Sequence, residues 1–147
     1  MVKRAIILAI CLPVDALGLI VVALVTLGSR PTWIRVPGAL VVTPRSSSWL
    51  ARCWPYSTTF GHVVLLHPLH GTRVLEHELV HVRQAEAACC TWALAALVSW
   101  DSLAVLYAWP FAWLLVYLSS CLAAWLAGRD WYTGSVFEQH AREESGA

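Results

Sequence analysis

Two histidines and a glutamate lie within five residues of this chain, in the segment His77–Glu78–Leu79–Val80–His81. On a helix, residues four apart lie on the same face, so His77 and His81 can share one metal ion. Glu78 then stands beside the metal, where it can take a proton from a zinc-bound water and pass it to a leaving amine. The spacing predicts a catalytic zinc centre. The alternative is a polar helix face with two unrelated histidines.

A catalytic zinc ion has a third protein ligand and one open position. A third histidine shortly after the first two is excluded, because no histidine follows His81 until His140. A glutamate from a later helix is the other solution, and Glu138 begins an E-x-x-A pattern that ends at Ala141. The residues that could complete the site by type are His62, His67, His70, Glu138, His140, Glu143 and Glu144.

The run H-E-x-x-H-x-x-Q from His77 to Gln84, with the later segment Tyr132 … Phe137–Glu138–Gln139–His140–Ala141, resembles gluzincin-type zinc metallopeptidases. It looks most like short bacterial membrane-associated members with a downstream Y-x-x-N-P-F-E-x-E-A motif. Their distant relatives include membrane proteases of the CAAX prenyl protease type. The resemblance covers residues 58–142. It implies that His77, His81 and Glu138 bind Zn²⁺ and that Glu78 is the catalytic base.

Three positions depart from the downstream motif. Ser135 stands where Asn is usual, Val136 where Pro is usual, and His140 where the second Glu is usual. The Glu138 ligand is kept, and Ala141 keeps the small residue that lets two helices approach. The three departures therefore change residues that would surround the metal ligands, not the ligands themselves.

Three further residues could support the metal site. Gln84 lies seven residues after His77 and so near the same helix face, where it can hold a ligand or support the fold. Tyr132 could stabilise an oxyanion or anchor the chain at a membrane interface. His140 could donate to the transition state or to Glu138, or belong to a solvated helix face.

The apolar run Gly61–His62–Val63–Val64–Leu65 is a candidate substrate-binding strand, because peptides often bind by adding a strand to a sheet edge. A core strand would have the same sequence. His62, His67 and His70 alternate with apolar residues around this run and are expected to be surface or structural groups.

The composition indicates a membrane protein. Of the 147 residues, 59% are hydrophobic and only 13% are charged, against about 25% charged in soluble domains. The formal net charge of +1 implies no attraction to nucleic acid. The expected partners are a lipid bilayer and a peptide or protein substrate. The five cysteines contain no C-x-x-C pair and predict no disulfide framework.

The first apolar run, residues 5–27, is long enough to cross a bilayer. A cleaved signal peptide is the competing reading, but no small-x-small cleavage site follows. We therefore expect an N-terminal transmembrane helix over residues 1–28, with Asp15 as its one acid. That acid is either functional, or it is a protonated or helix-paired aspartate without a function.

Residues 29–147 are expected to form a minimal metallopeptidase domain. Residues 38–43 and 61–66 are bounded by Gly and Pro and predict two strands of a small antiparallel sheet. Thr72 is a plausible N-cap for the helix that carries the two histidines, and a last helix is expected from Val136. The predicted fold is mainly α with this small sheet.

The stretch 85–127 contains only Glu86 and Asp101 as charges and is interrupted by Trp109–Pro110. It predicts a hydrophobic helical hairpin. Both of its ends must return to one metal, so the hairpin crosses the membrane twice or packs on it without crossing, and its length and central break favour two crossings. With the first helix this gives about three spans. Most arginines then share the side of the metal site, which favours a cytoplasmic-facing site in a bacterial inner membrane. They are Arg30, Arg35, Arg45, Arg52, Arg73, Arg83, Arg129 and Arg142, against Lys3 and Arg4.

Two functions fit this pattern. The first is a membrane-embedded zinc metalloendopeptidase. The second is a non-catalytic membrane protein, an adaptor or accessory subunit, in which zinc only joins helices.

Overall fold

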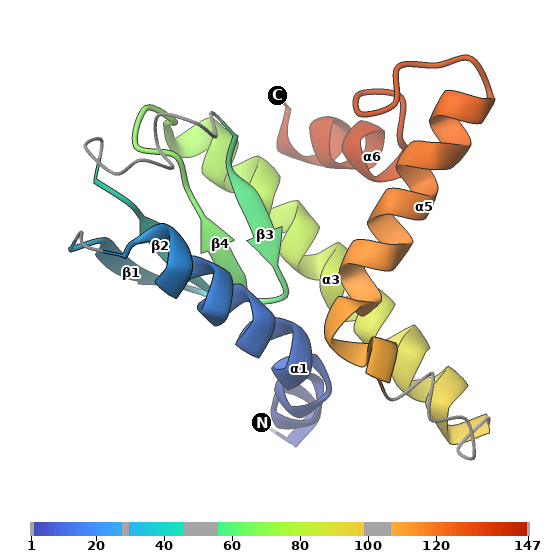
Figure 1. Ribbon diagram of the computed structural model, residues 1–147, viewed down its shortest axis with the longest axis horizontal. Helices are drawn as coiled ribbons and strands as arrows, with labels where there is room; N and C mark the ends of the chain where they lie inside the picture. Colours follow the sequence, from blue (N-terminus) through green and yellow to red (C-terminus); the bar gives the residue numbers. More distant parts are fainter. Residues whose placement is uncertain (1, 28–29, 46–55, 99–106, 147) are drawn as a thin grey trace.

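The computed structural model describes residues 2–27, 30–45, 56–98 and 107–146. The predicted boundary at residues 28–29 lies outside these ranges. The elements, in chain order, are α1 (Val2–Val25), β1 (Thr32–Val36), β2 (Ala39–Thr43), β3 (Thr58–Phe60), β4 (Val63–Leu65), α3 (Thr72–Val98), the 3₁₀ helix η1 (Trp109–Phe111), α5 (Ala112–Leu126) and α6 (Val136–Ser145) (Figure 1). The expectation of a mainly helical protein with a small sheet is confirmed.

The sheet is mixed, with the strand order β1-β2-β4-β3. β1 pairs antiparallel with β2, and β3 pairs antiparallel with β4. β2 and β4, however, are parallel, with Leu40 opposite Val63. The prediction that these two runs pair antiparallel is wrong. β1 and β2 form one hairpin with its turn at Gly38 (φ +89°), and β3 and β4 form another with its turn at Gly61 (φ +56°). β2 and β4 are thus the second strands of two hairpins that lie side by side in the same direction.

The sheet lies between two helices. On one face Val22 and Val25 of α1 pack against Val42, Val63 and Leu65. On the other face the α3 residues Leu75, Leu79 and Val82 pack against Ala39, Val41 and Val64. β4 is buried throughout, which explains its continuous apolar sequence. The result is a three-layer core, with α1 and α3 on opposite faces of the strands (Figure 1).

α1 is apolar on both its faces. Cys11, Val14, Gly18 and Val22 are buried at helical spacing and form the inward face. The outward face exposes large side chains, among them Ile6, Leu12, Leu19, Ile20 and Leu24. In the described residues, α1 and the segment Trp109–Leu126 are long and apolar enough to cross a membrane. The third predicted span is not among them.

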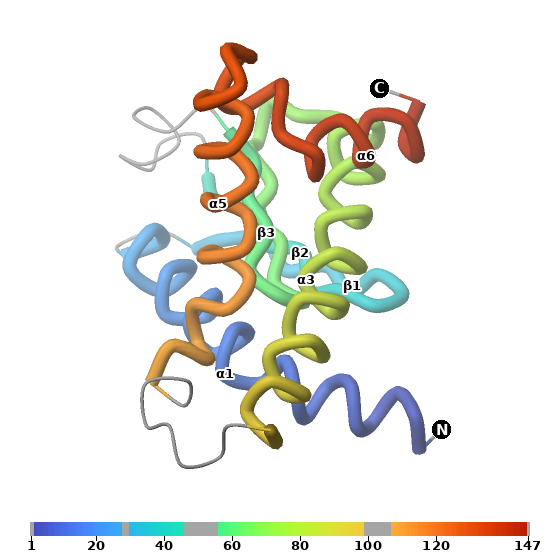
Figure 2. Tube along the Cα trace, turned by 90° about the vertical axis from the view of Figure 1, so that its right-hand side faces the viewer, coloured from blue at the N-terminus to red at the C-terminus, as the bar shows by residue number. Residues whose placement is uncertain are grey.

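α3 is one helix of 27 residues. The metal motif and the first half of the predicted hairpin therefore belong to the same helix. Pro110 stands at the start of η1, which leads into α5, as its missing N–H allows. α3 and α5 run in opposite directions, so the start of α3 and the end of α5 reach the same end of the molecule, beside α6 (Figures 1 and 2).

Candidate metal centre

His77 and His81 of α3 meet Glu138 of α6 at this end of the molecule. The Nε2 atoms of the two histidines are 3.2 Å apart. Glu138 Oε2 lies 3.2 Å from His77 Nε2, and Glu138 Oε1 lies 3.1 Å from His81 Nε2. His81 and Glu138 are buried and His77 is half-buried. These three residues, brought together from 61 positions apart in sequence, could hold a metal ion.

The separations of the donor atoms fit a single ion. Nitrogen and oxygen ligands at about 2.0–2.1 Å from a tetrahedral metal lie about 3.3 Å from each other. The observed separations of 3.1–3.2 Å are close to that value.

Gln84 determines which nitrogen of His81 faces this point. Its Oε1 lies 2.7 Å from His81 Nδ1 and can only accept, so Nδ1 carries the hydrogen and Nε2 is left as an electron-pair donor. The amide nitrogen of Gln84 donates to the carbonyl of Phe137 at 3.1 Å, on α6. Gln84 therefore orients one ligand and joins the two helices that carry the ligands.

Tyr117 of α5 fixes the third ligand. Its hydroxyl donates to Glu138 Oε1 at 2.6 Å, and Glu138 is only 1% exposed. Burial alone would raise the pKa of Glu138. The contacts with the imidazoles of His77 and His81 and the hydrogen bond from Tyr117 outweigh burial and hold that pKa well below its usual range. Glu138 is thus an ionised carboxylate at neutral pH.

The three positions that depart from the downstream motif, Ser135, Val136 and His140, each have local contacts. Ser135 is the N-cap of α6, and its hydroxyl accepts from the backbone N–H of Glu138 at 3.2 Å. The backbone N–H of Val136 donates to Ser120 Oγ at 3.1 Å, which a proline could not do. His140 is exposed, with Nδ1 3.2 Å from Gln84 Nε2 and Nε2 3.4 Å from Glu144.

Glu78 is buried beside β3. Thr59 Oγ1 lies 2.6 Å from Glu78 Oε2 and donates to it. Burial raises the pKa of Glu78, against the hydrogen bond from Thr59 and the charge of His81, which lower it. The carboxyl group is therefore held in a setting that favours uptake of a proton.

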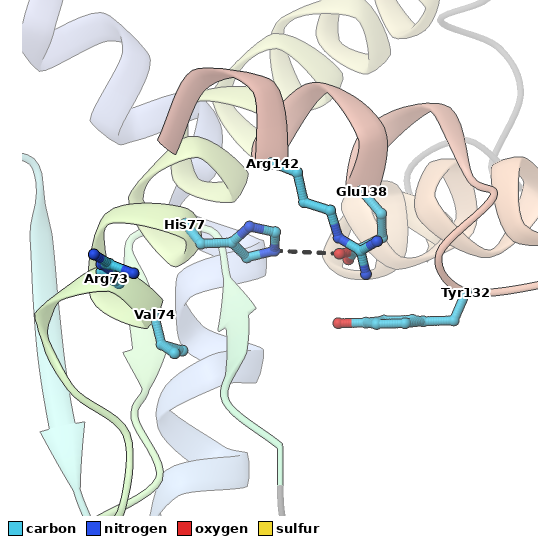
Figure 3. A pocket seen from close by; sticks show the side chains of 6 residues that line it. All are labelled: Arg73, Val74, His77, Tyr132, Glu138 and Arg142. Atoms are coloured by element: carbon cyan, nitrogen blue, oxygen red, sulfur yellow. Dashed lines mark hydrogen bonds and ion pairs between the residues drawn. The ribbon is translucent and has the colours of Figure 1, made fainter. Parts of the chain in front are cut away.

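A small pocket of about 220 Å³ opens beside the three candidate ligands. It is lined by Arg73, Val74, His77, Tyr132, Glu138 and Arg142 (Figure 3). Tyr132 comes from the segment before α6, and its ring lies along the pocket with the hydroxyl directed inward (Figure 3). Burial and the charge of Glu138 raise the pKa of Tyr132, which therefore keeps its proton.

The predicted substrate-binding strand is placed differently. β4 pairs with β2 on one side and β3 on the other, so residues 61–65 offer no free strand edge. β4 is a central strand of the core, as the alternative interpretation had it, and Gly61 and His62 form the turn before it. β3 is the edge strand nearest the metal centre, and Trp113 Nε1 of α5 donates to the carbonyl of Thr59 on it at 3.2 Å.

His62 has a structural partner, as expected. Its Nδ1 lies 2.9 Å from Asp15 Oδ2 in α1, and its Nε2 lies 3.0 Å from Glu86 Oε1 in α3. The backbone N–H of His62 also donates to Asp15 Oδ1 at 2.6 Å. The acid in the first helix is therefore paired within the protein.

Sequence reasoning did not identify Tyr117, Trp113 or Thr59. The two aromatic residues stand in an apolar helix, where a membrane or core role looks the same. Thr59 lies in a three-residue strand with no distinguishing pattern. Tyr117 lies 21 residues from Glu138, and Thr59 lies 19 residues from Glu78. Neither separation is a helical or strand repeat that would indicate a contact.

No protein-family profile, curated protein or solved structure matches this chain. The residues and their geometry therefore carry the functional argument alone.

Proposed function

We propose that this protein is a membrane-embedded zinc metalloendopeptidase of the gluzincin type. The observation that carries the proposal is the meeting of His77 and His81 with Glu138, next to the buried Glu78. Two imidazoles and one carboxylate favour zinc over magnesium or calcium, which prefer oxygen ligands alone. Zinc, when bound, would polarise a peptide carbonyl and lower the pKa of a coordinated water to about 7.

The chain's own residues would do the remaining work. Glu78 accepts a proton at its carboxylate and delivers it to the departing amine, and its raised pKa suits both steps. Thr59 occupies Glu78 Oε2 and so holds that carboxylate in one orientation. Tyr132 keeps its proton and directs its hydroxyl into the pocket, where it can donate to a developing oxyanion.

The membrane setting rests on two helices. α1 and the segment Trp109–Leu126 are apolar enough to span a bilayer. The exposed Leu94, Leu97 and Val98 in the second half of α3 favour a third membrane segment there. We propose a bacterial inner-membrane protein that α1 anchors in the bilayer. The arginine-rich end of the molecule, which carries the candidate metal centre, would face the cytoplasm.

The decisive experiment compares Glu78→Gln with the wild type in detergent. Loss of a general base costs about 10²–10⁴-fold in rate. We expect the variant to keep one zinc per chain and to lose at least about a hundredfold in cleavage of an unstructured protein substrate such as casein. Undiminished cleavage by Glu78→Gln would rule out the proposed mechanism.

A second function is favoured by the depth of the site. Glu138 is almost fully buried, and Trp113 covers a carbonyl of the nearest sheet edge. These features suit a zinc ion that only joins α3 to α6 in an adaptor or accessory subunit. That function predicts a protein in which Glu78→Gln has no effect on any cellular phenotype, whereas His77→Ala lowers the unfolding temperature.

A further inference from the structure

Two arginines that have no role so far line the pocket beside the metal centre. Arg73 lies in the first turn of α3, one turn before His77, and Arg142 lies on α6, one turn after Glu138. Figure 3 shows Arg142 extending on the side of Glu138, whereas Arg73 lies on the other side of His77. The two elements that supply the ligands therefore each supply one guanidinium group.

Neither guanidinium group forms an ion pair within the part of the chain that the structure describes. The ion pairs found there engage Arg83 and histidines, not Arg73 or Arg142. The oxygens of Glu138 are already taken by His77, His81 and Tyr117. Because arginine is always protonated, the pocket lining carries two positive charges against the single negative charge of Glu138.

A bound divalent ion would add to this positive charge, because the one ligand carboxylate neutralises only half of the ion's charge of +2. The group that fills the pocket should then be an anion with planar oxygen acceptors, which a guanidinium group binds through two parallel hydrogen bonds. The volume of about 220 Å³ is below the roughly 300–1,000 Å³ of sites for drug-sized ligands. The pocket thus has room for a short peptide end. Val74 and Tyr132 provide its less polar wall.

We propose that Arg73 and Arg142 bind a carboxylate of the substrate, next to the bond that is cut. This inference rests on the proposed peptidase function and names its substrate class, a peptide with a carboxylate within the leaving segment. The carboxylate is either the C-terminus of the peptide or an acidic side chain near it. Both present the same two oxygens.

The test measures binding separately from cleavage. Zinc-loaded Glu78→Gln in detergent is titrated calorimetrically with three blocked tetrapeptides of alanine and leucine. One has a free C-terminus, one has a C-terminal amide, and one has the amide with glutamate as its last residue. The same titrations use Arg73→Gln and Arg142→Gln in that background. Arg35→Gln, at an exposed position of β1, is the matched control. Zinc content and unfolding temperature verify that each variant is folded.

We expect the free acid to bind at least about tenfold more tightly than the plain amide, and each pocket variant to lose about tenfold for the acid alone. Tight binding of the glutamate amide assigns the carboxylate to a side chain, and weak binding assigns it to the C-terminus. Equal affinities for acid and amide, unchanged by the arginine substitutions, would overturn the proposal. So would arginine variants that lose only their binding to phosphatidylglycerol vesicles, because the arginines would then contact lipid.

Failure of the peptidase function gives a different result. In that case the wild-type protein cleaves neither the three peptides nor casein, but the Glu78→Gln variant still binds the free acid through both arginines. This result would rule out the peptidase function and would still support a carboxylate-binding pocket.

Discussion

At the scale of the residue, Gln84 is the group through which the metal centre and the fold depend on each other. Its amide accepts from His81 and donates to the backbone of α6. The hydroxyl of Tyr117, on α5, donates to Glu138. Neither residue is a candidate ligand, yet both limit how the ligands can turn. Partners of this kind commonly contribute 10–100-fold to metal affinity.

Substitution of Gln84 by alanine should therefore weaken zinc binding by about 10–100-fold. His81 loses the acceptor for Nδ1–H, so its ring is free to rotate and to change tautomer. The measurement is competition for zinc with a chelator of known affinity. Gln139→Ala on the exposed side of α6 is the control and should leave the affinity unchanged. Equal affinity of Gln84→Ala and wild type would contradict this role.

Tyr117→Phe removes one hydroxyl and leaves a buried carboxylate oxygen with one donor fewer. The loss of a hydrogen bond to a charged group costs about 1.5–3 kcal/mol, so zinc affinity should fall roughly tenfold or more. The exposed Tyr107 provides the matched substitution, Tyr107→Phe, which should have no effect. A wild-type affinity in Tyr117→Phe would show that the hydroxyl does not position Glu138.

The three residues that could hold a metal ion were predictable from sequence, because four-residue spacing places two histidines on one helix face and a later E-x-x-A pattern pointed to Glu138. The residues around them could not. Which side of α5 faces α6 depends on the packing of Trp113 against His81, Tyr117 and Phe137, with ring centroids 5.3–6.0 Å apart. An almost uniformly apolar helix contains no pattern that indicates this rotation.

At the scale of the element, α1 is attached to the sheet by a close approach and by a charged contact. A Cβ added to Gly18 would lie 2.7 Å from the Cβ of Phe60, so the helix and β3 touch at this point. Nearby, Asp15 accepts from the backbone and the ring of His62. These contacts mean that the proposed membrane anchor is part of the folded core.

Gly18→Val should separate α1 from the β3–β4 hairpin. Overpacking of this kind costs about 1–3 kcal/mol, which should appear as a lower midpoint of thermal unfolding in detergent. Gly71→Ala is the control, because a Cβ at Gly71 meets no atom within 4 Å. An unchanged midpoint for Gly18→Val would mean that α1 does not dock on the sheet.

The contact of α1 should also depend on pH. The hydrogen bond from His62 to Asp15, and the further one to Glu86, raise the pKa of His62 to about 9, although burial opposes the shift. The imidazolium form is thus stabilised by folding. Its contribution to the free energy of unfolding, at most about 3 kcal/mol, is complete below pH 6.5 and is lost as the pH rises through 9.

Unfolding measured from pH 6 to 10 in the wild type and in Asp15→Asn tests this dependence. The difference in the free energy of unfolding between the two proteins should be largest near pH 6 and shrink above pH 9. Comparing the two proteins at each pH removes the effect of other titrating groups. A difference that stays constant over this range would contradict the charged contact.

In the sheet, the presence of two strands was predictable from the sequence, but the way they pair was not. β2 and β4 were recognisable as apolar runs between turn residues, but their direction relative to each other was not. It depends on β1, which is exposed at four of its five positions, and on β3, which has only three residues. Short exposed strands carry little pattern, so their pairing partners could not be read.

At the scale of the whole molecule, the apolar segments and the metal centre form one structure. Two antiparallel helices, α3 and α5, return the chain to the end where α6 closes the site (Figure 2). This return was predictable, because ligands that share a metal must lie on the same side of any membrane between them. The continuous α3 was not, since the change from polar to apolar sequence within one helix resembles a boundary.

The zinc content of the purified chain decides whether His77, His81 and Glu138 bind a metal ion. The arrangement of His77, His81 and Glu138 predicts close to one zinc ion per chain by elemental analysis, and almost none in Glu138→Ala that remains folded. A wild-type protein purified with zinc in the medium but without bound metal would contradict the account. So would a Glu138→Ala variant that retains a full equivalent.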